Sequence, residues 1–237
     1  MRRCGVVETP HRRRAAAHAR SHEVQVLLLD LDETLYPRGN GVLRRIDGRI
    51  NSFMTDRLGI DPATVDAERA ELCARWGTTM RGLLERFALD IDDYLAHCHG
   101  VDLSDLLAPD PRLRALLERL PLRKAVLTNA PRRHARQVLD LLGIADLMER
   151  VFALEDIGYV PKPAPSAFAT ATAELGVEPG ACVFVDDMLA SVRAAAGHGL
   201  HAVWLAPPDA EPVDDAEHHV VRDVHELETL LGRLLDR

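Results

Sequence analysis

Long apolar segments are absent from this 237-residue sequence. No run approaches the roughly 20 apolar residues that a helix needs to cross a bilayer, which argues against a protein of the membrane. Cysteine is rare as well: there are four, none of them in a Cys-x-x-Cys pair, and their spacings suit neither a zinc site nor a disulfide framework. This usage fits a reducing, cytoplasmic compartment.

Lysine is scarcer still, because the chain has 27 arginines but only two lysines, Lys124 and Lys162. Lys162 stands between two prolines, where an ordinary surface cation is not expected. Lysine and arginine are not interchangeable where a compact point charge is needed. The choice of lysine at this position marks Lys162 as a candidate functional residue.

Positive charge is concentrated at the N-terminus, whereas the rest of the chain is acidic. The net charge is −8, yet residues 1–22 contain six Arg and one Glu. We expect these residues to form a disordered basic extension, because no apolar segment of the kind that a secretory signal requires follows their arginine pairs. The acidic remainder offers no basic face to a phosphate backbone, so nucleic acid is not an expected partner.

Five short apolar runs alternate with helical patterns over much of the chain. The runs are 24–29, 125–127, 151–154, 182–185 and 201–205. They show little polar alternation, which is typical of parallel strands that are buried on both faces. Helical patterns cover 131–142, 165–175 and 189–196. Strands that alternate with helices predict an α/β fold with a doubly wound, Rossmann-like parallel sheet.

One stretch breaks this alternation, because no convincing strand occurs between residues 36 and 109. Helical segments are expected there instead, near 42–58, 62–75, 79–88 and 91–99. Several helices in succession between two strands predict a small bundle that is inserted into the sheet domain. We therefore expect a core of residues 23–41 and 108–237, with residues 42–107 forming a helical cap over the edge of the sheet.

Polar residues follow four of the five apolar runs, at the points where the strands are expected to end. They are Asp30 and Asp32 after the first run, Thr128 and Asn129 after the second, Lys162 in the loop after the third, and Asp186 and Asp187 after the fourth. In an open parallel sheet, ligands bind outside the carboxyl ends of the strands. These side chains are therefore expected to meet in one site despite their separation along the chain.

The expected site combines several carboxylates with one hydroxyl and one ammonium group. Clustered carboxylates repel one another unless a cation lies among them. Mg²⁺ suits that position, because it prefers oxygen ligands, keeps some of its waters and commonly bridges carboxylates to a phosphate. The sequence therefore predicts a Mg²⁺-dependent enzyme that acts on a small phosphorylated metabolite.

Each residue of the site has a predicted role in the hydrolysis of a phosphate monoester. Asp30 attacks phosphorus and forms an aspartyl-phosphate. Asp32 protonates the leaving alcohol and then deprotonates the water that cleaves the intermediate. Thr128 donates a hydrogen bond to a phosphoryl oxygen, with Asn129 as a neighbouring substrate contact. Lys162 binds the substrate and balances the charge that spreads over the phosphoryl oxygens.

Four short motifs carry a resemblance to a known family. They are DLDETLY (30–36), LTNA (127–130), KP (162–163) and FVDD (184–187). In this order, each after an expected strand, they resemble the motifs of the haloacid dehalogenase-like (HAD) hydrolases, and the resemblance covers about residues 24–205. The insertion lies between the first and second motifs, as in the family members that have a helical C1 cap.

The resemblance also implies which residues hold the metal. In the family, the first aspartate of the first motif and the second aspartate of the fourth are direct ligands, and these correspond to Asp30 and Asp187. The backbone carbonyl of Asp32 is implied as a further ligand, and Asp186 as a nearby or water-mediated one. Many members have another acid four residues after the metal-binding aspartate, where this chain has Ser191. The pair Asp186 and Asp187 is expected to supply the missing charge.

Finer details resemble the pyrimidine 5′-nucleotidases, which remove phosphate from nucleoside monophosphates such as UMP and CMP. They are DETLY in the first motif, WGTTMRGL (76–83) in the expected cap, and LGIADL (142–147). The cap segment carries the most weight, because the core reads only the phosphate. Arg81 in this segment is a candidate substrate contact, since a guanidinium can donate to a base carbonyl or a ribose oxygen. A solvated or packed position on its helix stays open.

Three other functions also stay open, as does the oligomeric state. A phosphatase or phosphomutase that acts on sugar phosphates, or on another small phosphorylated metabolite, would keep both Asp30 and Asp32. A dehalogenase shares the nucleophile but does not need the acid, so the presence of Asp32 favours phosphoryl chemistry. A non-catalytic binding protein would be signalled by the loss of Asp30, Asp32 or Lys162, and all three are present.

Overall fold

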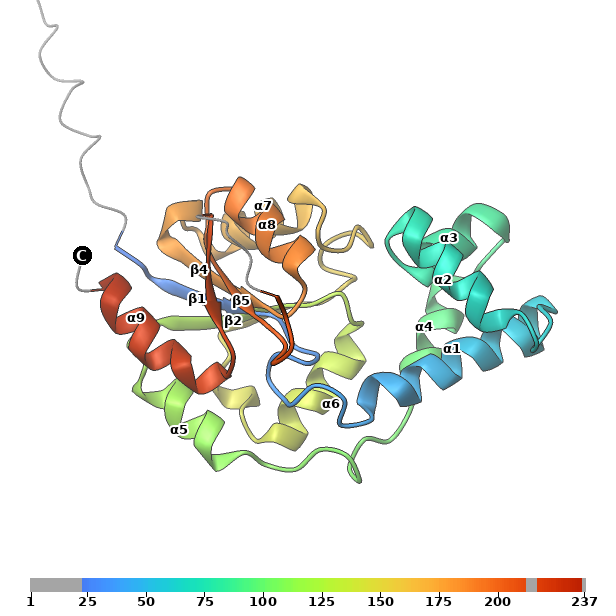
Figure 1. The fold of residues 1–237 in the computed structure, drawn as a ribbon, viewed down its shortest axis with the longest axis horizontal. Coiled ribbons are helices and arrows are strands. Elements are labelled where there is room, and N and C mark those ends of the chain that lie inside the picture. The colour runs from blue at the N-terminus through green and yellow to red at the C-terminus, as the bar shows by residue number, and fades with distance from the viewer. Residues whose placement is uncertain (1–22, 212–216, 236–237) are drawn as a thin grey trace, which may run out of the picture.

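The structure is a computed structural model in which residues 23–211 and 217–235 are described (Figure 1). Within these residues, six strands form one sheet in the order β3-β2-β1-β4-β5-β6, with all neighbours parallel. The strands are β1 (Val26–Leu29), β2 (Arg123–Leu127), β3 (Arg150–Phe152), β4 (Cys182–Asp186), β5 (His201–Leu205) and β6 (His218–Val221). Residues 1–22, for which a disordered basic extension is predicted, lie outside the described residues.

The central strand β1 shows why such short apolar segments become strands. All four of its residues are fully buried. Successive side chains of a strand point to opposite faces of the sheet, so Leu27 and Leu29 enter one apolar cluster and Leu28 enters the other. A strand that is apolar on both faces is stable only in a sheet that is covered on both sides.

Helices cover both faces of this sheet (Figure 1). One face carries α7 (Pro165–Leu175) and α8 (Leu189–Gly197), and the other carries α5 (Pro111–Arg119), α6 (Arg132–Leu142) and α9 (Leu227–Leu235). Short 3-10 helices are η1 (Ala145–Leu147), η2 (Pro179–Ala181) and η3 (Val224–Glu226). This arrangement confirms the predicted doubly wound, Rossmann-like α/β fold. Among the described residues, no helix combines the length and the apolar character needed to cross a membrane.

A second group of helices lies beside the sheet domain, away from the helices that cover it (Figure 1). It consists of α1 (Val42–Leu58), α2 (Val65–Trp76), α3 (Thr79–Arg86) and α4 (Ile91–His99). Its boundaries follow local signals. Gly59 ends α1 in a left-handed conformation, and the side chains of Thr78 and Asp90 cap the first turns of α3 and α4. These helices match the segments expected from the sequence to within a few residues.

Apolar contacts tie both ends of this helical group to the sheet domain. Val42 and Ile46 in the first turns of α1 are buried in the cluster under one face of the sheet. Leu103 and Leu107, in the segment that leads back to α5, are buried in the same cluster. Both ends of the segment 42–107 therefore pack with the sheet domain. The division of the chain into core (23–41 and 108–237) and cap (42–107) stays a prediction.

One strand and two α-helices of the described residues are not expected from the sequence. Strand β6 carries two histidines and exposes its two central residues, so it forms no apolar run. Helices α5 and α9 fall outside the helical patterns that the sequence pointed to. The start of α5 nevertheless follows a common rule, because the side chain of Asp110 accepts from backbone N–H groups and Pro111 occupies the first helical position.

Candidate active site

The carboxyl ends of parallel strands bring the predicted residues together. Asp30 follows β1 and continues its ladder, because its backbone N–H donates to the carbonyl of Val185 at 2.9 Å. Thr128 follows β2, and its N–H donates to the carbonyl of Phe152 at 2.9 Å. Asp186 is the last residue of β4. All three side chains that could act on a ligand are buried and therefore held by the rigid sheet.

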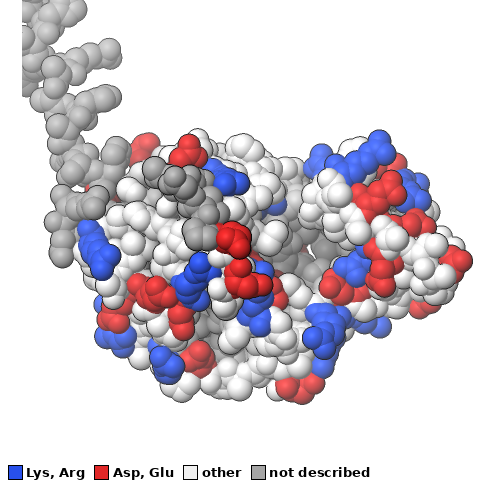
Figure 2. Space-filling view, in the orientation of Figure 1, with Lys and Arg blue, Asp and Glu red and all other residues white. Residues whose placement is uncertain are grey.

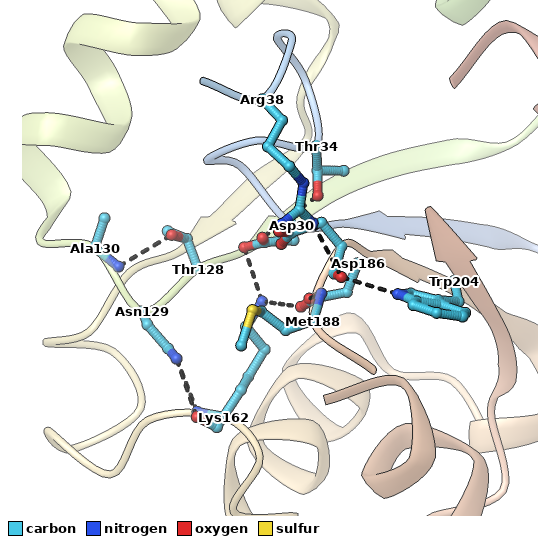
Figure 3. Close-up of polar contacts among 11 residues, drawn as sticks. Asp30, Thr34, Arg38, Thr128, Asn129, Ala130, Lys162, Asp186, Met188 and Trp204 are labelled. Carbon is cyan, nitrogen blue, oxygen red and sulfur yellow. Dashed lines mark hydrogen bonds and ion pairs between the residues drawn. The ribbon is translucent and has the colours of Figure 1, made fainter. Parts of the chain in front are cut away.

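Lys162 joins two of these carboxylates. Its Nζ donates to Oδ1 of Asp30 at 2.8 Å and to Oδ2 of Asp186 at 2.6 Å (Figure 3). The lysine side chain is 2% exposed. Burial lowers the pKa of its ammonium group, but the two carboxylates outweigh burial, so the pKa of Lys162 is raised above its ordinary value. The ammonium group therefore carries its charge at neutral pH.

Asn129 holds the main chain at Lys162. Its side-chain amide donates from Nδ2 to the carbonyl of Lys162 at 3.0 Å, and Oδ1 accepts from the backbone N–H of Lys162 at 2.7 Å. These two hydrogen bonds fix the loop that presents the lysine. The amide is thus engaged with the protein itself, and the predicted contact between Asn129 and substrate stays a prediction.

Thr128 lies beside this pair with its hydroxyl oriented by the backbone. Its Oγ1 accepts from the N–H of Ala130 at 3.0 Å, and the residue is 1% exposed. A hydroxyl oxygen that accepts from a backbone N–H still has its own O–H as a donor. Thr128 can therefore donate to an anion at this site, and its role toward a phosphoryl oxygen stays a prediction.

Burial dominates the electrostatics of Asp30. Burial raises the pKa of this carboxyl well above its usual range, against the opposing effect of Lys162, and nearby Asp186 raises it further. The second oxygen, Oδ2, has a long contact of 3.5 Å with the hydroxyl of Thr34. A cation in addition to Lys162 would favour the ionised form of Asp30, which is the form that the predicted role as a nucleophile requires.

The two aspartates of the fourth motif have different surroundings. Oδ1 of Asp186 accepts from the backbone N–H of Met188 at 2.7 Å, while its Oδ2 faces the lysine. Asp187 pairs with Arg38, whose Nη2 lies 2.5 Å from Oδ2, and the carbonyl of Asp187 accepts from Nε1 of Trp204 at 2.9 Å. Burial, together with Asp186, raises the pKa of Asp187 to about 6, although Arg38 acts in the opposite direction.

Asp30, Asp186 and Asp187 form a buried acidic cluster. Each offers one carboxylate oxygen, and these oxygens all lie within 4.8 Å of one another. Three buried carboxylates at this spacing are a donor set suited to a hard divalent cation. The structure therefore brings together the side chains that the sequence predicts as metal ligands. Their metal-binding roles, and that of the Asp32 carbonyl, stay predictions.

Asp32 has other partners, one of which the sequence does not single out. Its Oδ1 lies 2.6 Å from the hydroxyl of Tyr36 and 2.7 Å from Nε2 of His134. Burial by itself raises the pKa of Asp32, but His134 and Tyr36 together hold it below its usual range. His134 is fully buried in the first turn of α6. Its one signal in the sequence is its place just after the second motif, near the carboxyl end of β2.

A small cavity of about 130 Å³ lies where the helical group meets the loops of the sheet domain. Its lining includes Thr78, Thr79 and His99 from the helical group and Asn129 and Pro161 from the sheet domain. Asn129 also bonds to the main chain of Lys162. The cavity therefore borders the site and offers space next to it for part of a ligand.

Arg81, the predicted substrate contact, is exposed and is not among the residues that line this cavity. Its backbone N–H donates to Oγ1 of Thr78 at 3.2 Å, in the cap of α3. Thr78 and Thr79, from the same sequence segment, do line the cavity. The substrate contact of Arg81 stays a prediction, and the two threonines are further candidates for a substrate contact.

The face of the molecule shown in Figure 2 mixes acidic and basic side chains, and a hollow lies between the sheet domain and the group α1–α4. On this face, positive charge is not gathered into a broad basic surface, which is the kind of surface that a nucleic-acid backbone requires.

Known proteins are similar to this chain in sequence and in fold. A family model described as haloacid dehalogenase-like hydrolase matches residues 24–199. Phosphate metabolism protein 8 of Saccharomyces cerevisiae is 26% identical over 234 residues, which cover 87% of this chain and 72% of that protein. N-acetylmuramic acid 6-phosphate phosphatase of Pseudomonas aeruginosa is 29% identical over 149 residues, which cover 61% of this chain and 65% of that protein. A solved structure of a HAD phosphatase from Thermococcus onnurineus shares the fold, with a TM-score of 0.64 at 23% identity over 88% of this chain and 98% of that chain.

Proposed function

The chain belongs to the haloacid dehalogenase-like hydrolase family, and from this membership we propose that it is a Mg²⁺-dependent phosphate-monoester hydrolase that forms an aspartyl-phosphate on Asp30. The observation that carries the proposal is the position of Lys162, whose ammonium group joins Asp30 and Asp186 beside Asp187. One fully buried ammonium among three buried carboxylates leaves an excess of negative charge. A divalent cation would balance that excess, so that a negatively charged phosphate could bind.

In the first half-reaction, a carboxylate oxygen of Asp30 bonds to phosphorus while the bond from phosphorus to the leaving oxygen breaks. Asp32 gives its proton to that oxygen, which departs as the alcohol. Lys162 and the hydroxyl of Thr128 stabilise the charge on the phosphoryl oxygens. In the second half-reaction, Asp32 takes a proton from a water that attacks phosphorus, and inorganic phosphate leaves Asp30.

Asp32 has to carry a proton when the alcohol departs and has to be ionised when the water attacks. In the free site, His134 and Tyr36 hold the pKa of Asp32 low, which favours the ionised form that acts as a base. A phosphate monoester bound nearby adds negative charge and raises that pKa. Substrate binding therefore favours the protonated form that the first half-reaction needs.

The donor set of the acidic cluster fits Mg²⁺. Asp30, Asp186 and Asp187 are buried and offer oxygen atoms, which this ion prefers, and one carboxylate oxygen of each lies within 4.8 Å of the others. They would hold the ion together with the carbonyl of Asp32, which the family resemblance implies. When bound, Mg²⁺ would neutralise negative charge on the carboxylates and on the phosphoryl group.

Pyrimidine nucleoside monophosphates are the proposed substrates. The resemblance of the segment 76–83 to pyrimidine 5′-nucleotidases supports this choice, and two residues of that segment, Thr78 and Thr79, line the cavity beside the site. A sugar phosphate is the second candidate. The name of the Pseudomonas aeruginosa relative, N-acetylmuramic acid 6-phosphate phosphatase, favours a leaving group of that kind.

A phosphate-release screen tests the proposal. The purified chain is assayed with Mg²⁺ against pyrimidine and purine monophosphates, sugar phosphates and p-nitrophenyl phosphate, with Asp30→Asn as the matched control. We expect release from several esters by the wild-type protein, with UMP or CMP hydrolysed best, and none by the variant. Preference for a sugar phosphate would remove the nucleotidase assignment and keep the phosphatase. No release from any ester would contradict both.

A further inference from the structure

One oxygen of Asp32 receives two hydrogen-bond donors. Oδ1 accepts from the hydroxyl of Tyr36 at 2.6 Å and lies 2.7 Å from Nε2 of His134. An ionised carboxylate can only accept, so Nε2 of His134 carries the hydrogen in this contact. Within the described part of the chain, Oδ2 of Asp32 has no hydrogen bond. The two oxygens of this carboxyl group are therefore not equivalent.

The partners of Asp32 come from elements that are far apart in the sequence. Tyr36 lies in the loop after β1, while His134 lies in the first turn of α6, 102 residues after Asp32. Both partners are buried, and the His134 side chain is 0% exposed. A side chain held from two directions by short hydrogen bonds has one preferred orientation, and the reaction depends on that orientation.

We propose that His134 is a positioning residue for the proposed hydrolysis, because it fixes Asp32 so that Oδ2 is the oxygen that exchanges a proton with the leaving alcohol. The inference rests on the phosphatase function proposed above. In the step that it serves, the proton on Oδ2 passes to the leaving oxygen as the bond from that oxygen to phosphorus breaks. Oδ1 keeps both of its donors throughout, and Asp32 ends the step as a carboxylate.

A second histidine links this arrangement to the helical group. His99, the last residue of α4, makes an edge-to-face contact with His134, with ring centroids 5.5 Å apart and an interplanar angle of 73°. Nδ1 of His134 has no hydrogen-bond partner among the described residues. The ring of His134 is therefore held by Asp32 on one side and by packing, including that of His99, on the other. The orientation of Asp32 thus depends on the docking of α4.

Leaving-group dependence tests the proposal. An alkyl alkoxide is a poor leaving group and needs a proton, whereas p-nitrophenolate leaves without one. The value of kcat/KM reports the transfer to Asp30 and excludes hydrolysis of the aspartyl-phosphate. We expect His134→Leu to lower kcat/KM by about 10- to 100-fold for the alkyl phosphate that the wild-type protein hydrolyses best, but by less than about 3-fold for p-nitrophenyl phosphate.

Further variants separate positioning from damage to the fold. His134→Gln keeps an N–H donor near the place of Nε2, so it is expected to recover most of the loss. Tyr36→Phe removes the other donor without changing the shape of the ring and is expected to show the same selective loss. His99→Leu is expected to show a smaller selective loss. His97 lies on the same helix and packs against Phe53, so His97→Leu is the matched control. It is expected to leave the ratio of kcat/KM for the alkyl phosphate to kcat/KM for p-nitrophenyl phosphate unchanged.

The outcomes distinguish this inference from the proposed function. Equal losses on both substrates for His134→Leu, in a variant with wild-type circular dichroism, would overturn positioning and leave the phosphatase intact. A selective loss that His134→Gln does not recover would also overturn it. If His99→Leu leaves the ratio of the two kcat/KM values unchanged, the link to α4 is overturned. Failure of the wild-type protein to release phosphate from any ester would overturn the proposed function itself.

Discussion

Nζ of Lys162 lies 2.8 Å from Oδ1 of Asp30, although 132 residues separate them in the sequence. Both side chains are buried, so the pair is shielded from solvent and its charges act at full strength on whatever binds beside them. The same ammonium group reaches Asp186 at 2.6 Å. Removal of this one cation would leave two buried carboxylates without their partner.

Lys162→Ala is therefore expected to lower kcat/KM for every phosphate ester by about 1,000-fold, because the site loses its fixed positive charge. Lys162→Arg is not expected to restore activity, since a planar guanidinium does not fit where a compact ammonium is held. Steady-state kinetics with p-nitrophenyl phosphate measure both effects. The other lysine provides the control: Lys124 donates to the carbonyl of Leu120, and Lys124→Ala is expected to keep its activity. A Lys162→Ala protein that works within a few-fold of wild type would contradict this role.

Chelation is expected to abolish activity, and Mg²⁺ is expected to restore it. Asp187→Ala should weaken Mg²⁺ binding more than Asp186→Ala. The reason is that both oxygens of Asp186 already accept from the protein, from Lys162 and from the N–H of Met188. For Asp187, the contact at a side-chain oxygen is with Arg38. Calorimetric titration with Mg²⁺ alone gives the affinities without relying on turnover. The reverse order of affinities would make Asp186 and not Asp187 the direct ligand, and full activity after exhaustive chelation would show that the reaction needs no metal.

Substrate discrimination is expected to come from the helical group. Arg81→Ala should lower kcat/KM for UMP or CMP by about 10-fold or more, because a lost hydrogen bond to substrate costs more than a lost apolar contact. Thr79→Val, which removes one hydroxyl from the cavity lining, is the companion variant with the same expected direction. Neither variant should change p-nitrophenyl phosphate turnover to the same extent, since that ester has no ribose or base. Equal losses on both substrates would place these residues in the fold and not in specificity.

Acid is expected to destabilise the protein through His99. Burial, and then the charge of His134, lower the pKa of His99 to about 4 from its ordinary value of 6.5. The folded state therefore binds fewer protons than the unfolded state in this range, so stability is complete above pH 6.5 and falls as the pH drops toward 4. Between pH 7 and pH 5 the loss is expected to be about 2 kcal/mol.

Urea unfolding of the wild-type protein and of His99→Gln at both pH values isolates this contribution from other groups. Burial raises the pKa of Asp187 to about 6, so protonation of Asp187 stabilises the folded state over the same pH range. This effect is present in both proteins and cancels when their losses of stability are compared. The variant should lose less stability on acidification than the wild-type protein. The same loss in both proteins would show that His99 is protonated as readily in the fold as in solution.

Much of the fold and the site follows from where polar residues stand relative to apolar runs. Asp30 and Asp186 were predicted to meet because each ends a fully buried parallel strand, and neighbouring parallel strands end at the same edge. Lys162 was predicted from the scarcity of lysine and from its place in the loop after the third run. These signals can be read from short segments of the sequence. The residues come together because the parallel strands that they follow end at the same edge of the sheet.

The parts that were not predicted depend on contacts between distant segments. His134 shows no spacing typical of a ligand, and its value as a partner of Asp32 arises only when α6 packs against the loop after β1. Arg38 likewise meets Asp187 across 149 residues. Strand β6 was missed for a different reason, because an edge strand with two exposed residues has no apolar run to reveal it.

Trapping the proposed covalent intermediate on Asp30 is the decisive test of the mechanism. The protein is mixed with Mg²⁺ and excess substrate, quenched, and treated with borohydride, which reduces an aspartyl-phosphate to homoserine; mass spectrometry then reads the peptide that contains residue 30. We expect homoserine at position 30 in the wild-type protein, and none after omission of substrate or in the Asp30→Asn variant, with turnover lost in that variant while its circular dichroism is kept. Continued turnover by Asp30→Asn, or a reduced residue at any other aspartate, would contradict the proposed mechanism.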